Sequence, residues 1–236
     1  MSVSKGNIVF LIMHRIGHLY ETLLDKERIK EIIILASRKK THRQSVRHVI
    51  ENVDHYADLT LQMLESNTFW LRPPTYKTIT ENGKTRELTV SPFFPNRVLD
   101  YVMVETIKPA IKKSMYEYCI GNVDGRGISF GKRAISKVYK KYKYYLKLDI
   151  HKFYPSVDSA KLVNFMQSKI KDQRFMNFAR YVVLSCPDLP IGSYYSQWFS
   201  NWYLEDLDHS IKEEWHIPFY VRYVDDMLLL GNNKRV

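Results

Sequence analysis

Two adjacent carboxylates inside an apolar stretch are the first residues that could do chemistry. Asp225 and Asp226 interrupt the segment Phe219-Tyr-Val-Arg-Tyr-Val-Asp-Asp-Met-Leu-Leu-Leu230. A third acid, Asp149, lies near the end of another apolar run, Tyr144-Tyr-Leu-Lys-Leu-Asp-Ile150. An ionised carboxylate in apolar surroundings is costly unless it is paired or bound to a metal. Because Mg²⁺ prefers hard oxygen ligands, the pattern predicts a metal site made of Asp149, Asp225 and Asp226.

The elements that must position these acids are predicted to be strands. Residues 219–223 and 227–230 are expected to form two strands with the acids in the turn between them, and residues 144–148 a buried strand that leads to Asp149. Pairing of these strands would bring Asp225 beside the end of the third strand. Two Mg²⁺ ions about 3.5 to 4 Å apart in such a cluster can clamp the attacking and leaving oxygens of nucleotidyl transfer. The alternative is a solvated acidic turn without a catalytic role.

The positive charge is concentrated in the first part of the chain. The net charge is +11, yet residues 1–147 carry 26 Lys and Arg against 14 Asp and Glu, whereas residues 148–236 carry 10 against 11. Residues 132–147 contain seven basic residues, no acidic ones and four tyrosines. Interleaved cations and rings are typical of a surface that follows a nucleic-acid backbone and stacks on its bases. The alternative is a solvated, charged helix face.

The segment before the acids is predicted to contain helices and one hairpin. Apolar residues recur at helical spacing in residues 24–36, 46–64 and 98–115, with Pro109 expected to kink or split the last helix. Asn82-Gly83 separates two alternating Thr-rich runs between Tyr76 and Val90, which is a strong hairpin signal. The glycine-rich loop at residues 121–131 lacks both the Lys-Ser/Thr ending of a P-loop and the GxGxxG spacing of a dinucleotide fold.

Cysteine content and hydropathy exclude other classes of protein. Cys119 and Cys186 are too few for a disulfide framework or a zinc cage, so a reducing compartment is expected. The apolar run at residues 8–13 is far shorter than the ~20 residues that a membrane-spanning helix needs, and it is predicted to be a core segment. These observations predict a cytoplasmic protein without a membrane partner.

Four ordered motifs resemble those of the reverse transcriptases. Asp149-Ile-His-Lys-Phe-Tyr-Pro-Ser-Val157 resembles the first catalytic motif of the palm, and Tyr223-Val-Asp-Asp226 resembles the second. Residues 189–204 are similar to the segment between them that usually reads Pro-Gln-Gly followed by Ser-Pro, and residues 94–100 and Gly125-Arg-Gly127 resemble finger motifs. The resemblance covers about residues 70–231. It implies an RNA-directed DNA polymerase, a nucleotidyltransferase that uses two Mg²⁺ ions, for which Mn²⁺ can substitute.

Departures from the commonest pattern point to one subfamily. Ile191-Gly192 replaces Gln-Gly, and Ser196-Gln197 replaces Ser-Pro. This variant resembles the reverse transcriptases of diversity-generating retroelements, which implies error-prone copying of RNA for mutagenic retrohoming. The alternatives are a retron-type or abortive-infection reverse transcriptase, or an inactive truncated remnant that binds RNA. The expected partners are an RNA template, a DNA or RNA primer, dNTPs and, as in the subfamily, a basic accessory protein.

The fold implied by the resemblance is the right-hand polymerase of the α+β class, with fingers, a palm built on an antiparallel sheet, and no thumb. Residues 1–140 would form N-terminal helices and fingers. Residues 141–236 would form the palm, with residues 156–190 partly returning to the fingers. The chain is expected to be truncated before the thumb.

The resemblance also implies a role for each matching residue at the metal site. Asp149 and Asp225 would bind the two metal ions, with Asp226 supporting the cluster. Tyr154 matches the steric gate that excludes a ribose 2′-OH, the alternative being a core tyrosine. The backbone N–H groups around Lys152 and Phe153 would receive the triphosphate.

Further roles fall on residues outside the acidic motifs. Ile191 and Gly192 would lie against the templating base pair and relax the check on its geometry. Gln197 would orient the Ile191 loop or make a purely structural hydrogen bond. Arg126 would neutralise phosphate charge, since a guanidinium binds phosphate bidentately, and Arg97 and Lys147 are weaker candidates for the same role.

Overall fold

The computed structural model describes residues 15–81 and 83–234. The predicted core segment at residues 8–13 and Asn82 of the hairpin turn therefore lie outside the described residues. The elements in chain order are η1 (Glu21–Leu23), α1 (Lys26–Ser37), α2 (Gln44–Glu51), α3 (Val53–Ser66), β1 (Thr75–Glu81), β2 (Lys84–Val90), η2 (Phe93–Arg97), α4 (Val98–Ser114), α5 (Ile128–Val138), η3 (Tyr139–Lys141), β3 (Tyr144–Leu148), α6 (Phe153–Ser156), α7 (Ser159–Lys169), α8 (Gln173–Val183), α9 (Tyr194–Tyr203), α10 (Glu205–His209), η4 (Ser210–Glu214), β4 (Phe219–Tyr223) and β5 (Asp226–Gly231).

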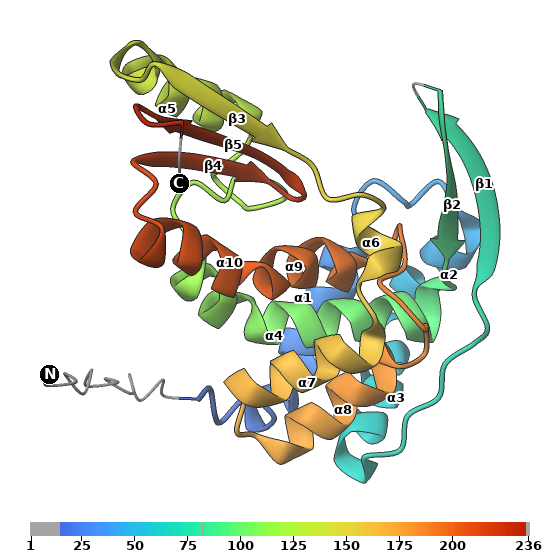
Figure 1. The fold of residues 1–236 in the computed structure, drawn as a ribbon. Helices are drawn as coiled ribbons and strands as arrows, with labels where there is room; N and C mark the ends of the chain where they lie inside the picture. Colours follow the sequence, from blue (N-terminus) through green and yellow to red (C-terminus); the bar gives the residue numbers. More distant parts are fainter. Residues whose placement is uncertain (1–14, 82, 235–236) are drawn as a thin grey trace, which may run out of the picture.

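The strands form two separate antiparallel sheets, which confirms the predicted α+β class (Figure 1). β1 and β2 make the predicted hairpin, with Glu81 opposite Lys84 and Gly83 at φ +75° in the turn. The second sheet has the order β3-β5-β4. α5 packs on one face of this sheet, and α10 and η4 pack on the other. The strand pair predicted around Asp225 and Asp226 is confirmed by β4 and β5.

A helical layer centred on α4 carries the larger hydrophobic core (Figure 1). α4 packs against α1, α8 and α9, and its Leu99, Val102, Met103 and Ile107 are completely buried. Aspartates begin three of the surrounding helices, since Asp25, Asp158 and Asp172 accept hydrogen bonds from backbone N–H groups in the first turn. None of the helices in the described part of the chain is long and apolar enough to cross a membrane.

Two helix predictions differ from the structure. The single helix expected over residues 46–64 is divided into α2 and α3 at Asn52, whose side-chain Nδ2 donates to the His48 carbonyl at 2.8 Å. Such local bonds compete with the helical pattern. Of the two outcomes predicted for Pro109, a kink or a split, the split is wrong, because α4 continues through Pro109 to Ser114. Ile107 and Ile111 on either side of the proline are fully buried, and this packing offsets the lost backbone hydrogen bond.

The prediction of a buried strand before Asp149 is also wrong. β3 is an edge strand, and all five of its residues are exposed, with Tyr145 at 77% and Leu146 at 50%. The helices that cover the sheet pack on β4 and β5 and leave β3 open to solvent. Asp149, which follows β3, is exposed as well. Because water reaches the Asp149 carboxylate, its charge can be solvated without an ion-pair partner or a metal.

The turn that contains Ile191 and Gly192 is attached to two distant elements. The Thr89 N–H of β2 donates to the Ile191 carbonyl at 2.8 Å. Gly192 has φ +106°, and a Cβ atom there would lie 3.0 Å from the Thr89 carbonyl oxygen. The next residue, Ser193, donates from Oγ to Oδ2 of the buried Asp100 on α4 at 2.9 Å. This turn therefore joins the hairpin to the helical core.

We expect Gly192→Ala to destabilise the protein more than Gly83→Ala. Both glycines have a positive φ, which costs a residue with a Cβ roughly 1–2 kcal/mol. Gly83 has open space around it, so only this cost applies there, whereas the methyl group added by Gly192→Ala would also press on the Thr89 carbonyl. Urea unfolding of the two variants measures the difference. Equal losses in the free energy of unfolding would show that the close approach to β2 does not matter.

Asp100 should make stability depend on pH. Burial raises the pKa of Asp100 to about 6, although Arg97 and the hydrogen bonds from Ser193 and the Tyr194 N–H lower it. Because the unfolded value is near ~3.9, the folded chain holds this proton more tightly. The contribution of Asp100 to the free energy of unfolding is fully present below about pH 4 and is lost as the pH rises through about 6.

Asp100→Asn should remove this dependence. Between about pH 4 and about pH 8, the free energy of unfolding of the wild type should fall relative to that of the variant by up to about 3 kcal/mol. Urea titrations of both proteins across this range measure the difference. A difference that stays constant with pH would contradict the assignment to Asp100.

Candidate active site

The turn between β4 and β5 carries the two adjacent acids. Tyr223 pairs with Asp226, and Val224 and Asp225 form the turn between them. Asp225 is half-buried and Asp226 is exposed. Leu148, the last residue of β3, pairs with Met227 on β5. Since Asp149 follows Leu148, the three predicted acids lie at the same end of the sheet.

The electrostatics of Asp225 reflect the proximity of the other two acids. Burial raises the pKa of Asp225, and the charges of Asp149 and Asp226 raise it further. A backbone hydrogen bond and the guanidinium of Arg86 act in the opposite direction. Like charges at this proximity favour binding of a cation or of a proton.

The donor set suits a divalent metal ion. Three carboxylates supply hard oxygen ligands and a local excess of negative charge, and two of them are open to solvent. The described residues nevertheless contain no group of three His, Cys, Asp or Glu side chains already arranged to hold a metal. Lys147 Nζ lies 3.6 Å from Asp226 Oδ1 and offsets part of the charge. Asp149, Asp225 and Asp226 remain the predicted metal ligands, and their side chains do not surround a common point in this structure.

Tyr154 lies beside the acids, on the short helix α6. Lys152 precedes this helix in the left-handed conformation, with φ 48°. Phe153 points into the core, whereas Tyr154 is half-buried. Burial raises the pKa of Tyr154, a hydrogen bond with Ser200 lowers it, and the charge of Asp225 raises it. The ring is therefore within electrostatic reach of Asp225, and its role as a steric gate stays a prediction.

The residues predicted to bind phosphate all have protein partners. Arg126 Nη1 donates to the carbonyls of Tyr116 at 2.6 Å and Cys119 at 3.2 Å, which holds the glycine loop in place. Arg97 Nη1 lies 3.6 Å from Oδ2 of the buried Asp100. Lys147 faces Asp226, as described above. These contacts give each cation a structural role besides the predicted one.

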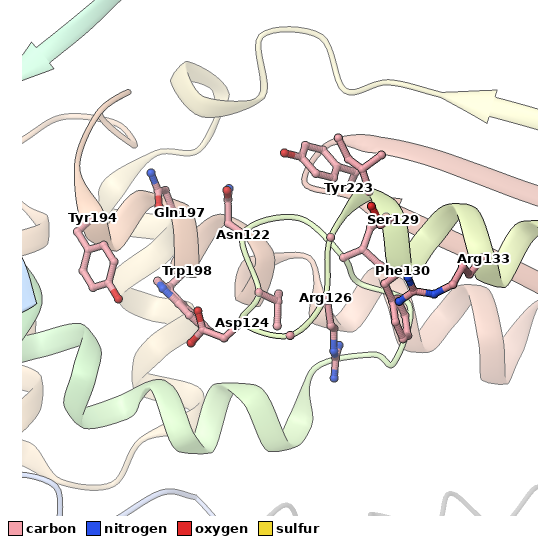
Figure 2. A pocket seen from close by; sticks show the side chains of 15 residues that line it. Asn122, Asp124, Arg126, Ser129, Phe130, Arg133, Tyr194, Gln197, Trp198 and Tyr223 are labelled. Carbon is pink, nitrogen blue, oxygen red and sulfur yellow. The ribbon is translucent and has the colours of Figure 1, made fainter. Parts of the chain in front are cut away.

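A groove of about 660 Å³ lies between the glycine loop and α9 (Figure 2). Arg126 and Asn122 line it from the loop, Gln197 and Trp198 from α9, and Tyr223 from the end of β4. Gln197 is exposed there, and only its backbone carbonyl is used among the described hydrogen bonds, by Ser200 and Asn201. Among the described residues no hydrogen bond joins its side chain to the Ile191 loop, so the orienting role of Gln197 stays a prediction.

Arg86 is a site residue that the sequence did not reveal. It lies on β2, far from the acids along the chain, yet its charge lowers the pKa of both Asp225 and Tyr154. The alternation of the hairpin predicts only that Arg86 and Glu87 point to opposite faces. Nothing local to the hairpin indicates which face turns toward the acids, because that depends on how the two sheets are placed.

One family of known proteins matches most of the chain. A family model described as "Reverse transcriptase (RNA-dependent DNA polymerase)" matches residues 77–236, which is more than half of the chain and includes all three acids. No curated protein matches the chain.

Two solved structures are similar to the chain. They are entitled "Partial Cas6-RT-Cas1--Cas2 complex" and "Cas6-RT-Cas1--Cas2 complex", and each matches with 19% identity and a TM-score of 0.48 over 92% of this chain. The chain spans 39% and 24% of the length of those two chains. The family match alone identifies the protein: the chain belongs to the reverse transcriptase (RNA-dependent DNA polymerase) family, whose enzymes are nucleotidyltransferases.

Proposed function

We propose that this chain carries the catalytic centre of an RNA-directed DNA polymerase that extends a primer with dNTPs by a two-metal mechanism. The observation that carries the proposal is the convergence of Asp149, Asp225 and Asp226 at one end of the sheet, beside Tyr154 and within electrostatic reach of Arg86. Asp149 and Asp225 would hold the metals, with Asp226 supporting them. Bound Mg²⁺ would activate the primer hydroxyl and neutralise charge on the reacting phosphates.

Other residues around the acids would bind and orient the nucleotide. The half-buried ring of Tyr154 would exclude a ribose 2′-OH. The backbone at Lys152 and Phe153 immediately precedes it and would receive the triphosphate. Arg86 would neutralise phosphate charge from the hairpin side, since a guanidinium pairs well with phosphate oxygens.

We assign the hairpin and N-terminal helices (residues 1–140) to the fingers, and residues 141–236, with the β3-β5-β4 sheet, to the palm. Ile191-Gly192 in place of Gln-Gly supports a diversity-generating role, in which error-prone copying rewrites a variable repeat during mutagenic retrohoming. The attachment of this turn to Thr89 of the hairpin supports a position between the proposed fingers and palm, where the turn would contact the templating base pair. The partners would be an RNA template, a DNA or RNA primer and a basic accessory protein.

Removal of either proposed metal ligand should abolish chemistry without abolishing RNA binding. We expect Asp149→Asn and Asp225→Asn to reduce Mg²⁺-dependent dNTP incorporation on a primed RNA template at least ~10²-fold, because a metal contributes several kcal/mol of transition-state stabilisation. RNA affinity should change little, since the positive charge lies mainly in residues 1–147. The assay compares this chain with any longer form of the protein from the same gene.

Asp206→Asn is the matched control for these variants. Asp206 is an exposed acid on α10 that pairs with Lys169 at 2.9 Å and belongs to neither the β4-β5 turn nor the end of β3. This control should keep wild-type activity. Full activity in either ligand variant would refute the metal assignment. Salt-sensitive RNA binding without incorporation by any wild-type form would instead favour the binding remnant.

Arg86→Gln should weaken nucleotide binding. Loss of a charge-assisted hydrogen bond of roughly 1.5–3 kcal/mol corresponds to a KM for dNTP about 10- to 100-fold higher. Lys84→Gln, which removes an exposed charge from the same hairpin, is the control and should leave KM near its wild-type value. An unchanged KM in Arg86→Gln would place the triphosphate elsewhere.

A further inference from the structure

A fully buried arginine lies two residues before the acidic turn. Arg222 on β4 has 0% exposure, and all five of its guanidinium N–H groups have acceptors within the protein. Nε and Nη2 donate to Oδ1 and Oδ2 of Asp208 at 2.8 and 2.5 Å. The other donors reach Oδ1 and the carbonyl of Asn201 at 3.0 and 3.1 Å, and the carbonyl of Val224 at 2.9 Å.

The acceptors connect three parts of the chain. Asn201 belongs to α9, Asp208 belongs to α10, and Val224 is the residue immediately before Asp225. The Tyr220 hydroxyl also donates to Asp208 Oδ1 at 2.8 Å, so the carboxylate accepts three hydrogen bonds. A buried ion pair is tolerated only when its lone pairs and protons are satisfied in this way.

Val224 has a backbone conformation that needs such support. Its φ of 57° lies in the left-handed region, which a β-branched residue rarely adopts. Its side chain is buried, and a Cβ atom at Gly121 would lie 2.7 Å from Val224 Cγ2 and from Val224 N. Asn201 Nδ2 donates to the Gly121 carbonyl at 2.6 Å, so the same asparagine that accepts from Arg222 also holds the glycine loop against the turn.

We propose that Arg222, with Asp208 and Asn201, is the positioning group that holds Val224 in the left-handed conformation and thereby directs Asp225 toward Asp149. The part of this inference that concerns a metal rests on the proposed function. The conformational part stands on the hydrogen bonds alone. Replacement of a buried ion pair by apolar residues of similar size often preserves stability, so stability and positioning can be separated in this network.

The test uses the triple variant Arg222→Met/Asp208→Leu/Tyr220→Phe, which removes the ion pair and the hydroxyl that would otherwise be left without an acceptor. Its matched control is Lys169→Met/Asp206→Leu, which removes another ion pair of α10, the one that Asp206 makes with Lys169 at the end of α7. Thermal unfolding measures stability, and hydrogen exchange without metal measures the protection of amides 223–227. Mn²⁺ binding followed by electron paramagnetic resonance measures the consequence for the acids.

The triple variant should unfold within a few degrees of the wild type, while the amides of the turn exchange at least ~10-fold faster and Mn²⁺ binds at least ~10-fold more weakly. The control should change neither quantity. Unchanged protection of the turn in a folded triple variant would overturn the positioning role and leave Arg222 as a component of the core.

If the triple variant does not fold, Arg222→Lys provides the same test. Lysine keeps the charge beside Asp208, yet it lacks the planar fork that reaches Asn201 and Val224 at once. The turn should again lose protection, and wild-type protection would again overturn the proposal. Should wild-type protein fail to bind Mn²⁺, the proposed metal site would be wrong, whereas hydrogen exchange would still decide the positioning role.

Discussion

The buried ion pair between Arg222 and Asp208 is the interaction on which the geometry of the candidate site depends. It joins β4 to α10 in a region without solvent, and through Asn201 it reaches α9 and the glycine loop. The desolvation cost of two charges is offset only while every donor and acceptor is paired. The network is therefore compatible with one packing of the sheet against the helices. This packing determines the position of the acidic turn.

The helical layer under the sheet has a second role, because it also holds the other side of the proposed site. α4 is covered by α1, α8 and α9, and it presents Asp100 to the turn that begins α9. The same turn receives the Thr89 N–H from the hairpin. The hairpin, the Ile191 turn and the acids are thus fixed to a common helical core, although they are far apart along the chain. A reaction that must bring a template, a primer and a nucleotide together needs such a common support.

Several sequence patterns predicted their local structures correctly, because the interactions that form them are local. The hairpin around Gly83 follows from a two-residue turn flanked by alternating residues, and β4 and β5 follow from short apolar runs on either side of two acids. The patterns failed where the outcome depended on packing or on competing bonds. Residues 46–64 divide at Asn52 through a side-chain bond, and α4 continues through Pro109 because its surroundings are packed. β3 is exposed because the helices that cover the sheet pack on β4 and β5.

The sequence by itself determined the family and the α+β class, and it predicted the three acids of the proposed site, because those acids occur in short motifs whose order is set by covalent connectivity. Only the tertiary structure determined which Lys and Arg side chains lie near these three acids. The charge of Arg86 acts on Asp225 and Tyr154 from a hairpin more than sixty residues away, and Arg126 and Arg97 make contacts of their own within the protein. Nor does the motif show that Arg222 is buried and bonded to Val224. Long-range contacts of this kind arise from the packing of sheets on helices, and no local pattern of residues encodes which side chains that packing will bring together.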